Sequence, residues 1–571
     1  MDHPYPSTFM PSSPPDSAAP VPAPAVLVPR RKARVALVAL AIAFTAADAL
    51  SAEALPSFAT LEKEGAIVGK IRIDAHNIFD LEDASENNAL FRLVNRLHVQ
   101  THEGVIRRLL LFRPGERVSV RAVEETERVM RTNRFLYEVT ITPAAVHDGI
   151  VDIDVITRDT WTLDLTGRFG RSGGTNSTAF GILDYNFLGT GVRLGISQVS
   201  DVDRHGTQVL VGYAQAFDGW TGVNLVRGHY SDGDRSTASV VRPFYSLDTR
   251  WAAGASWDRW NRIDNLYNAG EVAAKYRHRS DMGEIFAGWS PGLVAGWTQR
   301  LSVGAALQDH AYETVPLQTA AFPQPTDHDM RGLFLRHELV EDRFVKLRNR
   351  DQIARAEFFA MGFTSQLQLT RAIQGLGASR SAWLYSAAAS RGFSLSPSED
   401  LLLASVTLQR QIASTGKPLT QAGGLLRYFA PHGPYRAFYA SISADRLSRG
   451  AAAPDELLLG GDNGLRGYPL RYQSGDRRAL LTLEERVYTD WYPFRLARVG
   501  AAVFYDTGRA WGGVNPNRID PGWLSDVGVG LRIALDRAAF GNVLHADVAV
   551  PFPRAPGKKS VQFIVKTGVT F

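Results

Sequence analysis

Cysteine is absent from this chain of 571 residues. Its absence excludes disulfide bonds, thiolate catalysis and metal sites with cysteine ligands. A chain without cysteine is compatible with an exported protein that stays unfolded in transit, but cytosolic proteins can lack cysteine too.

Long apolar runs are scarce as well. The apolar run at 35–47 has about a dozen residues, whereas a helix that crosses a bilayer needs roughly 18 to 20. Basic residues precede this run, and Ala49 and Ala52 follow it, which is the order of a secretory signal peptide. We predict that residues 1–52 form a disordered extension and a signal peptide, cleaved after Ala49 or Ala52, and that no later segment crosses a membrane as a helix.

A strong excess of one charge is also missing. The chain has 63 basic and 58 acidic residues, a net charge of +5, and no long basic run follows Arg34. Because the two signs alternate along the chain, we predict no nucleic-acid partner.

Residues 65–158 have the pattern of a small α+β domain. An apolar face at helical spacing joins Leu90, Leu93, Val94 and Leu97, and Ser119 is placed to cap a second helix. The predicted elements are a strand at 66–74, helices at 89–97 and 120–135, and strands at 135–143 and 149–157.

Two histidines in this domain have the spacing of a metal-ligand pair on a helix. His98 and His102 stand four residues apart. No second ligand-rich motif completes a site, so we interpret them as an exposed pair and predict no metal and no cofactor.

From residue 159 to the end, apolar and polar residues alternate over spans of about ten residues. Val527, Val529 and Leu531 fall on one face, with Asp526 and Arg532 on the other. The last span ends on an aromatic residue and has one apolar face, formed by Phe563, Val565, Val569 and Phe571. Soluble sandwiches also alternate, but their outer faces need no uniform aliphatic stripe. We predict an all-β transmembrane barrel over 159–571 with about 16 antiparallel strands, and 18 would also fit.

The segment LGGDNGLRGYP at 459–469 places four glycines and a proline around one cation, Arg466. The alternation in two later spans directs Glu484 and Asp506 to the polar, luminal face. A carboxylate can hold the planar guanidinium with two hydrogen bonds, and arginine stays charged when buried. We predict that the loop folds into the lumen and that Arg466 pairs there; an exposed hairpin with a solvated arginine is the alternative.

Several motifs resemble those of the BamA and TamA superfamily. The residues Leu465, Arg466, Gly467 and Tyr468 resemble its (V/I)-R-G-(F/Y) loop signature. The segment FYDTGRAW, with Phe504, Gly508 and Trp511, resembles the F-x-D-x-G-x-x-W strand motif. NFLGTG at 186–191 resembles a segment near the start of the barrel, and LFRPGERVS and RTNRFLYEV resemble parts of a POTRA domain.

The resemblance implies a non-enzymatic machine in the outer membrane of a Gram-negative-type bacterium, with one POTRA-like domain in the periplasm. On the family pattern, Arg466 pairs with Asp506 and Glu484, which brace the loop. The implied partners are the lipid bilayer and unfolded outer-membrane or secreted polypeptides. These polypeptides would enter at a seam between the first barrel strand, 161–169, and the last, 561–571, and we expect Gly568 to weaken this seam. BamA, TamA and two-partner secretion transporters carry several POTRA units, so the single unit here leaves accessory partners open.

Two other functions remain as alternatives at this point. A passive porin would have the same barrel but would give no role to the POTRA-like domain. A hydrolase is the other, because GRSGG matches G-x-S-x-G around Ser172. That serine lies in a glycine-rich turn without a strand-to-helix elbow, so we predict no catalytic residues and no enzyme activity.

Overall fold

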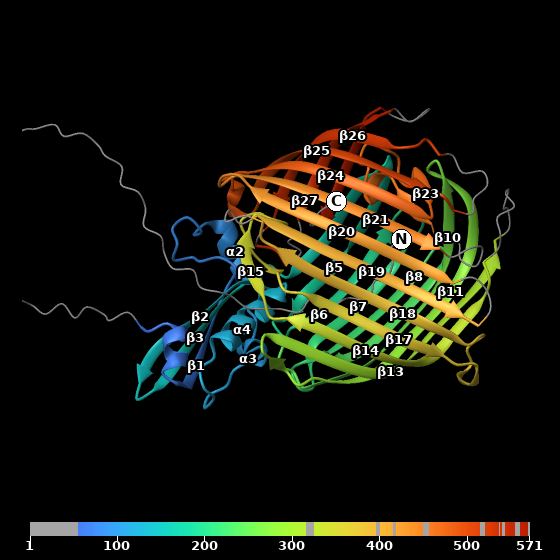
Figure 1. Cartoon of the computed structure of the whole chain (residues 1–571). Coiled ribbons are helices and arrows are strands. Elements are labelled where there is room, and N and C mark those ends of the chain that lie inside the picture. Colours follow the sequence, from blue (N-terminus) through green and yellow to red (C-terminus); the bar gives the residue numbers. More distant parts are fainter. Residues whose placement is uncertain are drawn as a thin grey trace, which may run out of the picture.

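The computed structural model describes residues 55–315, 325–395, 400–414, 418–448, 456–513, 520–535, 537–539, 543–553 and 560–568. The predicted signal peptide and the terminal residues Val569 and Phe571 lie outside the described residues. Figure 1 shows two units, a small unit of helices and strands at one end of a large barrel.

The barrel is closed and antiparallel, with twenty strands in the described part of the chain (Figure 1). The first eight are β4 (Leu163–Ser172), β5 (Thr175–Phe187), β6 (Val192–Ser200), β7 (His205–Ala216), β8 (Thr221–Tyr230), β9 (Gly233–Arg242), β10 (Trp251–Asn268) and β11 (Glu271–Trp289). Next come β13 (Trp297–Thr314), β14 (His328–Glu341), β17 (Thr364–Ala372), β18 (Ala382–Phe393), β19 (Leu401–Ala413), β20 (Leu419–Pro431) and β21 (Arg436–Ser448). The ring ends with β24 (Arg477–Tyr488), β25 (Arg498–Trp511), β26 (Leu524–Ala534), β27 (Val543–Phe552) and β28 (Gln562–Gly568), and the two-residue β12 (Leu293–Val294) pairs beside β13.

The prediction of 16 or 18 strands was therefore wrong. That prediction assumed that long loops at one end of the barrel would take up much of the sequence. In the structure only two residues separate β4 from β5, β8 from β9 and β10 from β11. These short turns leave enough chain for additional strands.

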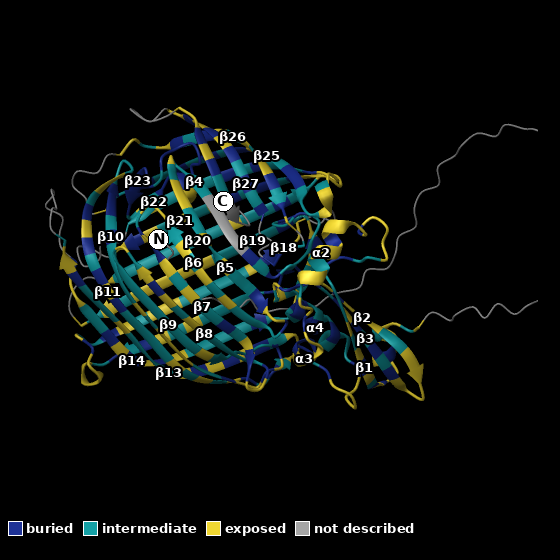
Figure 2. Ribbon diagram, turned by 180° about the vertical axis from the view of Figure 1, so that it is seen from behind, coloured by how far each residue is buried: buried dark blue, intermediate teal, exposed yellow. Residues whose placement is uncertain are grey.

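The alternation in the sequence becomes an apolar outer wall and a polar lumen. Figure 2 shows exposed and buried bands alternating along the barrel strands. Val503, Val529 and Phe563 point outward and are each more than half exposed, whereas Phe504 and Asp526 point inward and are buried. Successive side chains of a strand lie on opposite faces, so one pattern builds both surfaces.

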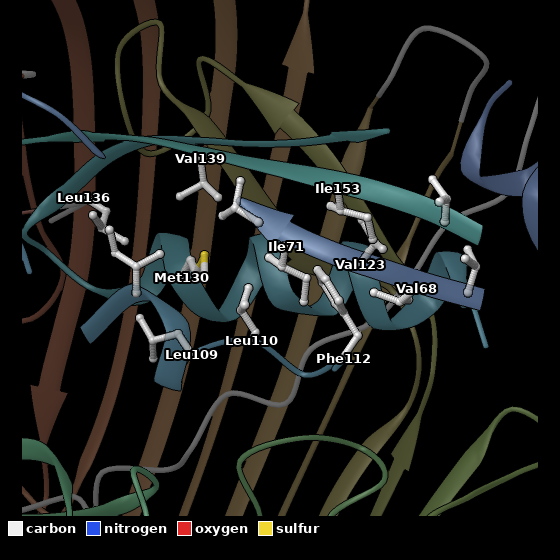
Figure 3. Packing of buried hydrophobic residues seen from close by; sticks show 14 of the residues in the cluster. Val68, Ile71, Leu109, Leu110, Phe112, Val123, Met130, Leu136, Val139 and Ile153 are labelled. Carbon is white, nitrogen blue, oxygen red and sulfur yellow. The ribbon is translucent and has the colours of Figure 1, made fainter. Parts of the chain in front are cut away.

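The small unit is a three-stranded sheet packed on helices. Its elements are α1 (Phe58–Lys63), β1 (Ile67–His76), α2 (Ala89–Leu97), α3 (Glu103–Arg108), α4 (Val120–Thr132), β2 (Leu136–His147) and β3 (Ile150–Asp159). The sheet order is β1-β3-β2, with β1 parallel and β2 antiparallel to β3. Figure 3 shows Val123 and Met130, two turns apart on α4, against Val68, Ile71 and Ile153 of the sheet. Nowhere in the described chain is a helix both long and apolar enough for a bilayer crossing.

The interpretation of His98 and His102 as an exposed pair was wrong for His98. Helix α2 ends at Leu97, and His102 precedes α3, so the two histidines share no helix. The His98 side chain is 3% exposed, and its Nε2 lies 2.9 Å from Oδ2 of the buried Asp159. Sequence reasoning missed this contact because Asp159 is 61 residues away.

The NFLGTG segment forms the turn between β5 and β6, and the small unit docks on this turn. Asn186 Nδ2 donates to Thr101 Oγ1 at 2.8 Å, and the His102 amide donates to the Gly189 carbonyl at 2.9 Å. Gly189 has a φ of +71°, and a Cβ atom there would lie 2.2 Å from the Gln100 carbonyl oxygen. Only glycine tolerates both conditions. We call the end of the barrel that carries the β5–β6 turn the docking end, and the opposite end the far end.

Helix α4 makes a second contact at the docking end, with the segment between β9 and β10. Glu125 is buried, and its Oε1 accepts a hydrogen bond of 2.9 Å from the Leu247 amide. Arg121 forms an ion pair with Asp248 next to it. Charged groups from both units therefore meet where the small unit touches the barrel.

We expect the contact between α4 and the barrel to be tighter at pH 5 than at pH 8. Asp342 directly follows β14 at the docking end, near the charged residues of α4. Burial and, next, the charge of Glu125 raise its pKa from 3.8 to about 6, opposed by Arg121 and Arg128, while Asp248 adds to the rise. A carboxyl whose pKa is raised on folding stabilises the folded contact fully below pH of about 4, and this contribution is lost as the pH rises through 6.

Hydrogen exchange of the α4 amides, corrected for intrinsic rates, measures this effect. Exchange should be several-fold slower at pH 5 than at pH 8 in the native protein. Asp342→Asn, which stays neutral, should remove the difference. Equal protection at both pH values in the native protein would contradict the prediction.

Candidate functional site in the barrel lumen

The segment between β21 and β24 folds back into the barrel from the far end; we call residues 456–476 the luminal loop. It contains β22 (Leu457–Leu459), the short helix η3 (Gly461–Asn463) and β23 (Gln473–Gly475), and β22 pairs with β23. Gly464 and Leu465 both have positive φ, +88° and +56°, where the chain turns toward the wall. Leu465, Arg466 and Tyr468 are fully buried.

Both carboxylates that the sequence assigned to Arg466 contact it in the structure. The guanidinium donates to Asp506 through Nε at 2.7 Å and Nη2 at 3.0 Å, which is a bidentate pair. Its Nη1 donates to Glu484 Oε1 at 2.7 Å. The guanidinium carbon lies 3.4 Å from the centroid of the Phe504 ring, so the cation is also stacked on an aromatic face.

Three further members of this network were not found from the sequence. Asp547 Oδ2 accepts from Arg466 Nη1 at 3.3 Å. Arg532 contacts both Asp547 and Glu484, and Arg486 Nε donates to Glu484 Oε2 at 2.8 Å. These contacts join three arginines and three carboxylates in a buried cluster, with the buried Asp526 opposite Asp506 on the neighbouring strand, and loss of one partner strands a charge. The alternation placed these side chains on luminal faces, but it does not tell which strands are neighbours.

Gly467 and Tyr468 fix the loop against the wall beyond Arg466. A Cβ atom on Gly467 would lie 2.6 Å from the Asp526 Cβ, so the signature glycine is needed for close approach rather than for a positive φ. The Tyr468 hydroxyl donates to the Pro553 carbonyl at 2.7 Å, with the Ser525 carbonyl at 3.3 Å. The loop is therefore attached to β24, β25, β26 and β27.

The other predicted site residues lie in the wall itself. Gly508 faces the lumen, where a Cβ atom would lie 2.7 Å from the Ala479 carbonyl, and Trp511 ends β25. Phe563 is exposed on the outer wall, and Val565 is the residue of β28 that pairs with β4. Ser172 ends β4 at a tight hairpin turn into β5.

The first and last strands of the barrel meet at a weakly paired seam. In the described residues, β28 and β4 share one register pair, Val565 with Arg171. By comparison, β27 and β28 share seven pairs, and β4 and β5 share ten. The luminal loop touches both sides of the seam, because the Leu470 amide donates to the Gly173 carbonyl at 3.3 Å and Lys566 Nζ donates to the Asp462 carbonyl at 3.3 Å.

Comparison with known proteins gives similarity only among solved structures. No protein-family model and no curated protein matches the chain. The structure is similar to BamA from Haemophilus ducreyi lacking POTRA domains 1-3, at 14% identity over 88% of this chain and 84% of that chain, with a TM-score of 0.36. It is also similar to CdiB from Acinetobacter baumannii and from Escherichia coli, each at 12% identity over 88% of this chain, covering 73% and 76% of those chains, with TM-scores of 0.44.

Proposed function

We propose that this protein inserts polypeptides into the outer membrane of a Gram-negative-type bacterium or passes them across it. The supporting observation is the seam, where the barrel is closed by one register pair in the described residues. Within the described residues, the facing edges of β4 and β28 share so little pairing that they can accept another strand.

A weak seam has a direct chemical use in a lipid bilayer. Unpaired backbone N–H and C=O groups are costly in hydrocarbon, where water cannot bond them. A client strand that pairs with β4 or β28 satisfies its own groups and those of the barrel edge at once. The seam thus provides a template on which a client folds as it enters the membrane.

The outer wall supports the assignment to a membrane. Its strands are mostly about ten residues or longer and present aliphatic side chains outward, as a barrel surrounded by lipid requires. The small unit has the strand, helix, helix, strand, strand order of a POTRA-like domain, with two short additional helices, α1 and α3. We assign it to the periplasm, where its edge strand β2 can hold unfolded chains by strand addition.

A quantitative outer-membrane proteome of the host, with and without this protein, tests the proposal. We expect a defined set of barrels or surface proteins to disappear, and the intact chain but not Arg466→Ala to restore them. If nothing but the protein itself changes, the proposal fails and a passive channel becomes the better explanation, with bilayer conductance as its measurement.

A further inference from the structure

A second segment folds into the lumen, and nothing in the sequence pattern predicted it. Residues 344–360, which we call the mouth hairpin, contain β15 (Phe344–Arg348) and β16 (Ala356–Ala360). Within the described chain, these two strands pair with each other and not with the ring. The hairpin leaves the wall between β14 and β17 at the docking end, and Figure 1 shows β15 beside the small unit.

The body of the mouth hairpin packs on the inner wall. Leu347 and Phe359 lie in one buried cluster with Phe429 of β20 and Tyr439 of β21. The ring centroids of Phe359 and Phe429 are 6.2 Å apart. Ile442, on the opposite face of β21, is half exposed on the outer wall, so this cluster lies inside the barrel.

The tip of the mouth hairpin reaches far around the ring. Ile353 is 4% exposed and packs with four luminal residues on β21, β24, β26 and β27, namely Ala437, Tyr488, Ala534 and Val543. Asp351 forms an ion pair of 3.0 Å with Arg427 of β20. The hairpin therefore crosses from its origin at β14 and β17 toward the strands that carry the ion-pair network.

One arginine connects the mouth hairpin to the luminal loop. Arg486 Nη1 donates to the Arg350 carbonyl at 2.8 Å, and its Nε donates to Glu484, which also binds Arg466. Near the base of the hairpin, Lys346 Nζ lies 2.8 Å from Glu127 Oε1 of α4. The hairpin thus contacts the small unit and the buried ion pairs simultaneously.

We propose that the mouth hairpin is a displaceable plug that closes the docking end of the barrel, and that Arg486 couples its seating to the luminal loop. An isolated two-stranded hairpin is marginally stable, so its position depends on the luminal contacts that hold it. When the hairpin leaves the lumen, Arg486 loses its hydrogen bond to the Arg350 carbonyl. The Arg486 side chain can then move, which changes its bond to Glu484. This coupling is reciprocal, so movement of the luminal loop also changes how firmly the hairpin sits.

Single-channel conductance of the full chain in planar bilayers tests the plug without any client. The native barrel should be mostly closed, and replacing residues 344–360 with a short Gly-Ser linker should give a steady open conductance. Folding of this variant is checked by its heat-dependent mobility in detergent gels. A folded variant that conducts like the native barrel would overturn the proposal.

An engineered disulfide gives an independent test, because the chain has no cysteine of its own. Ile353→Cys with Ala437→Cys, two residues of one packed cluster, should abolish openings when oxidised, and reductant should restore them. The matched pair Val503→Cys and Val529→Cys joins neighbouring strands on the outer wall and should leave openings unchanged. Openings that persist in the oxidised hairpin variant would count against a plug.

The coupling is tested by Arg486→Met, which leaves Glu484 paired with Arg466 and Arg532. Openings should become about tenfold more frequent, the effect of losing one hydrogen bond to a charged group. Arg336→Met is the control, since this luminal arginine pairs with Glu284 and lies outside the hairpin contacts. Equal effects of the two variants would refute the coupling.

Discussion

Arg466→Ala is expected to lower the free energy of unfolding of the barrel by about 3–5 kcal/mol, the cost of breaking a buried charge pair by removing one partner. The side chain is 0% exposed, and its carboxylate partners are at most 1% exposed, so water cannot replace it. Glu484 keeps Arg486 and Arg532, but Asp506 loses both bonds that Arg466 donates to it. Urea unfolding, followed by heat-dependent mobility in detergent gels, measures the loss.

Two matched variants identify the cause of this loss. Arg466→Lys keeps the charge without the planar fork, so its stability should fall between native and Arg466→Ala. Arg509→Ala removes an arginine whose pair with Asp520 is about a third exposed, and it should cost less than about 1 kcal/mol. If Arg466→Ala unfolds at the native urea concentration, the network is not what stabilises the loop.

A covalent bridge across the seam is expected to stop client insertion almost completely. Arg171→Cys and Val565→Cys place cysteines at the register pair that joins β4 to β28. Paired residues of antiparallel strands have Cβ atoms roughly 4.5–5.5 Å apart, near the range that a disulfide needs. Oxidation should reduce insertion of a radiolabelled barrel into proteoliposomes at least about tenfold, and reductant should restore it.

The control for this bridge is a disulfide between strands that are already fully paired. Val503 and Val529 are direct partners in the long ladder of β25 and β26. An oxidised Val503→Cys and Val529→Cys variant carries the same modification but should insert clients at the native rate. If the seam bridge is equally harmless, insertion does not require the seam to open.

The sequence predicted the side on which each luminal side chain lies better than it predicted neighbours. Strict alternation is a local property, so Glu484 and Asp506 could be assigned to the lumen from their own strands. Asp547 lies on a luminal face by the same rule, yet it is 81 residues from Arg466, and only closure of the ring brings the two together. Long-range pairing is decided by register and turn length, which local patterns do not contain.

The mouth hairpin shows a second limit of the pattern. Residues 344–348 and 356–360 form strands, but each has only five residues. A transmembrane strand needs about nine to eleven residues, so strand length was the available signal. His98 shows a third limit, because its partner Asp159 belongs to a different element of the small unit.

The contact at the β5–β6 turn has a mechanical consequence. Asp159 accepts from the Thr101 amide at 2.7 Å and from Thr101 Oγ1 at 2.8 Å, and Asn186 binds that same hydroxyl, all of them buried. In contrast, the contact of Asp83 with Arg495 is long, at 4.0 Å, and exposed to water, so it breaks at little cost. The same edge is also held by Glu86, which pairs with Arg537 at 2.6 Å with both side chains largely buried, and α4 adds the buried contact of Glu125 with Leu247. The small unit is therefore fastened at several places around the docking end, so loss of any one contact leaves it held by the others.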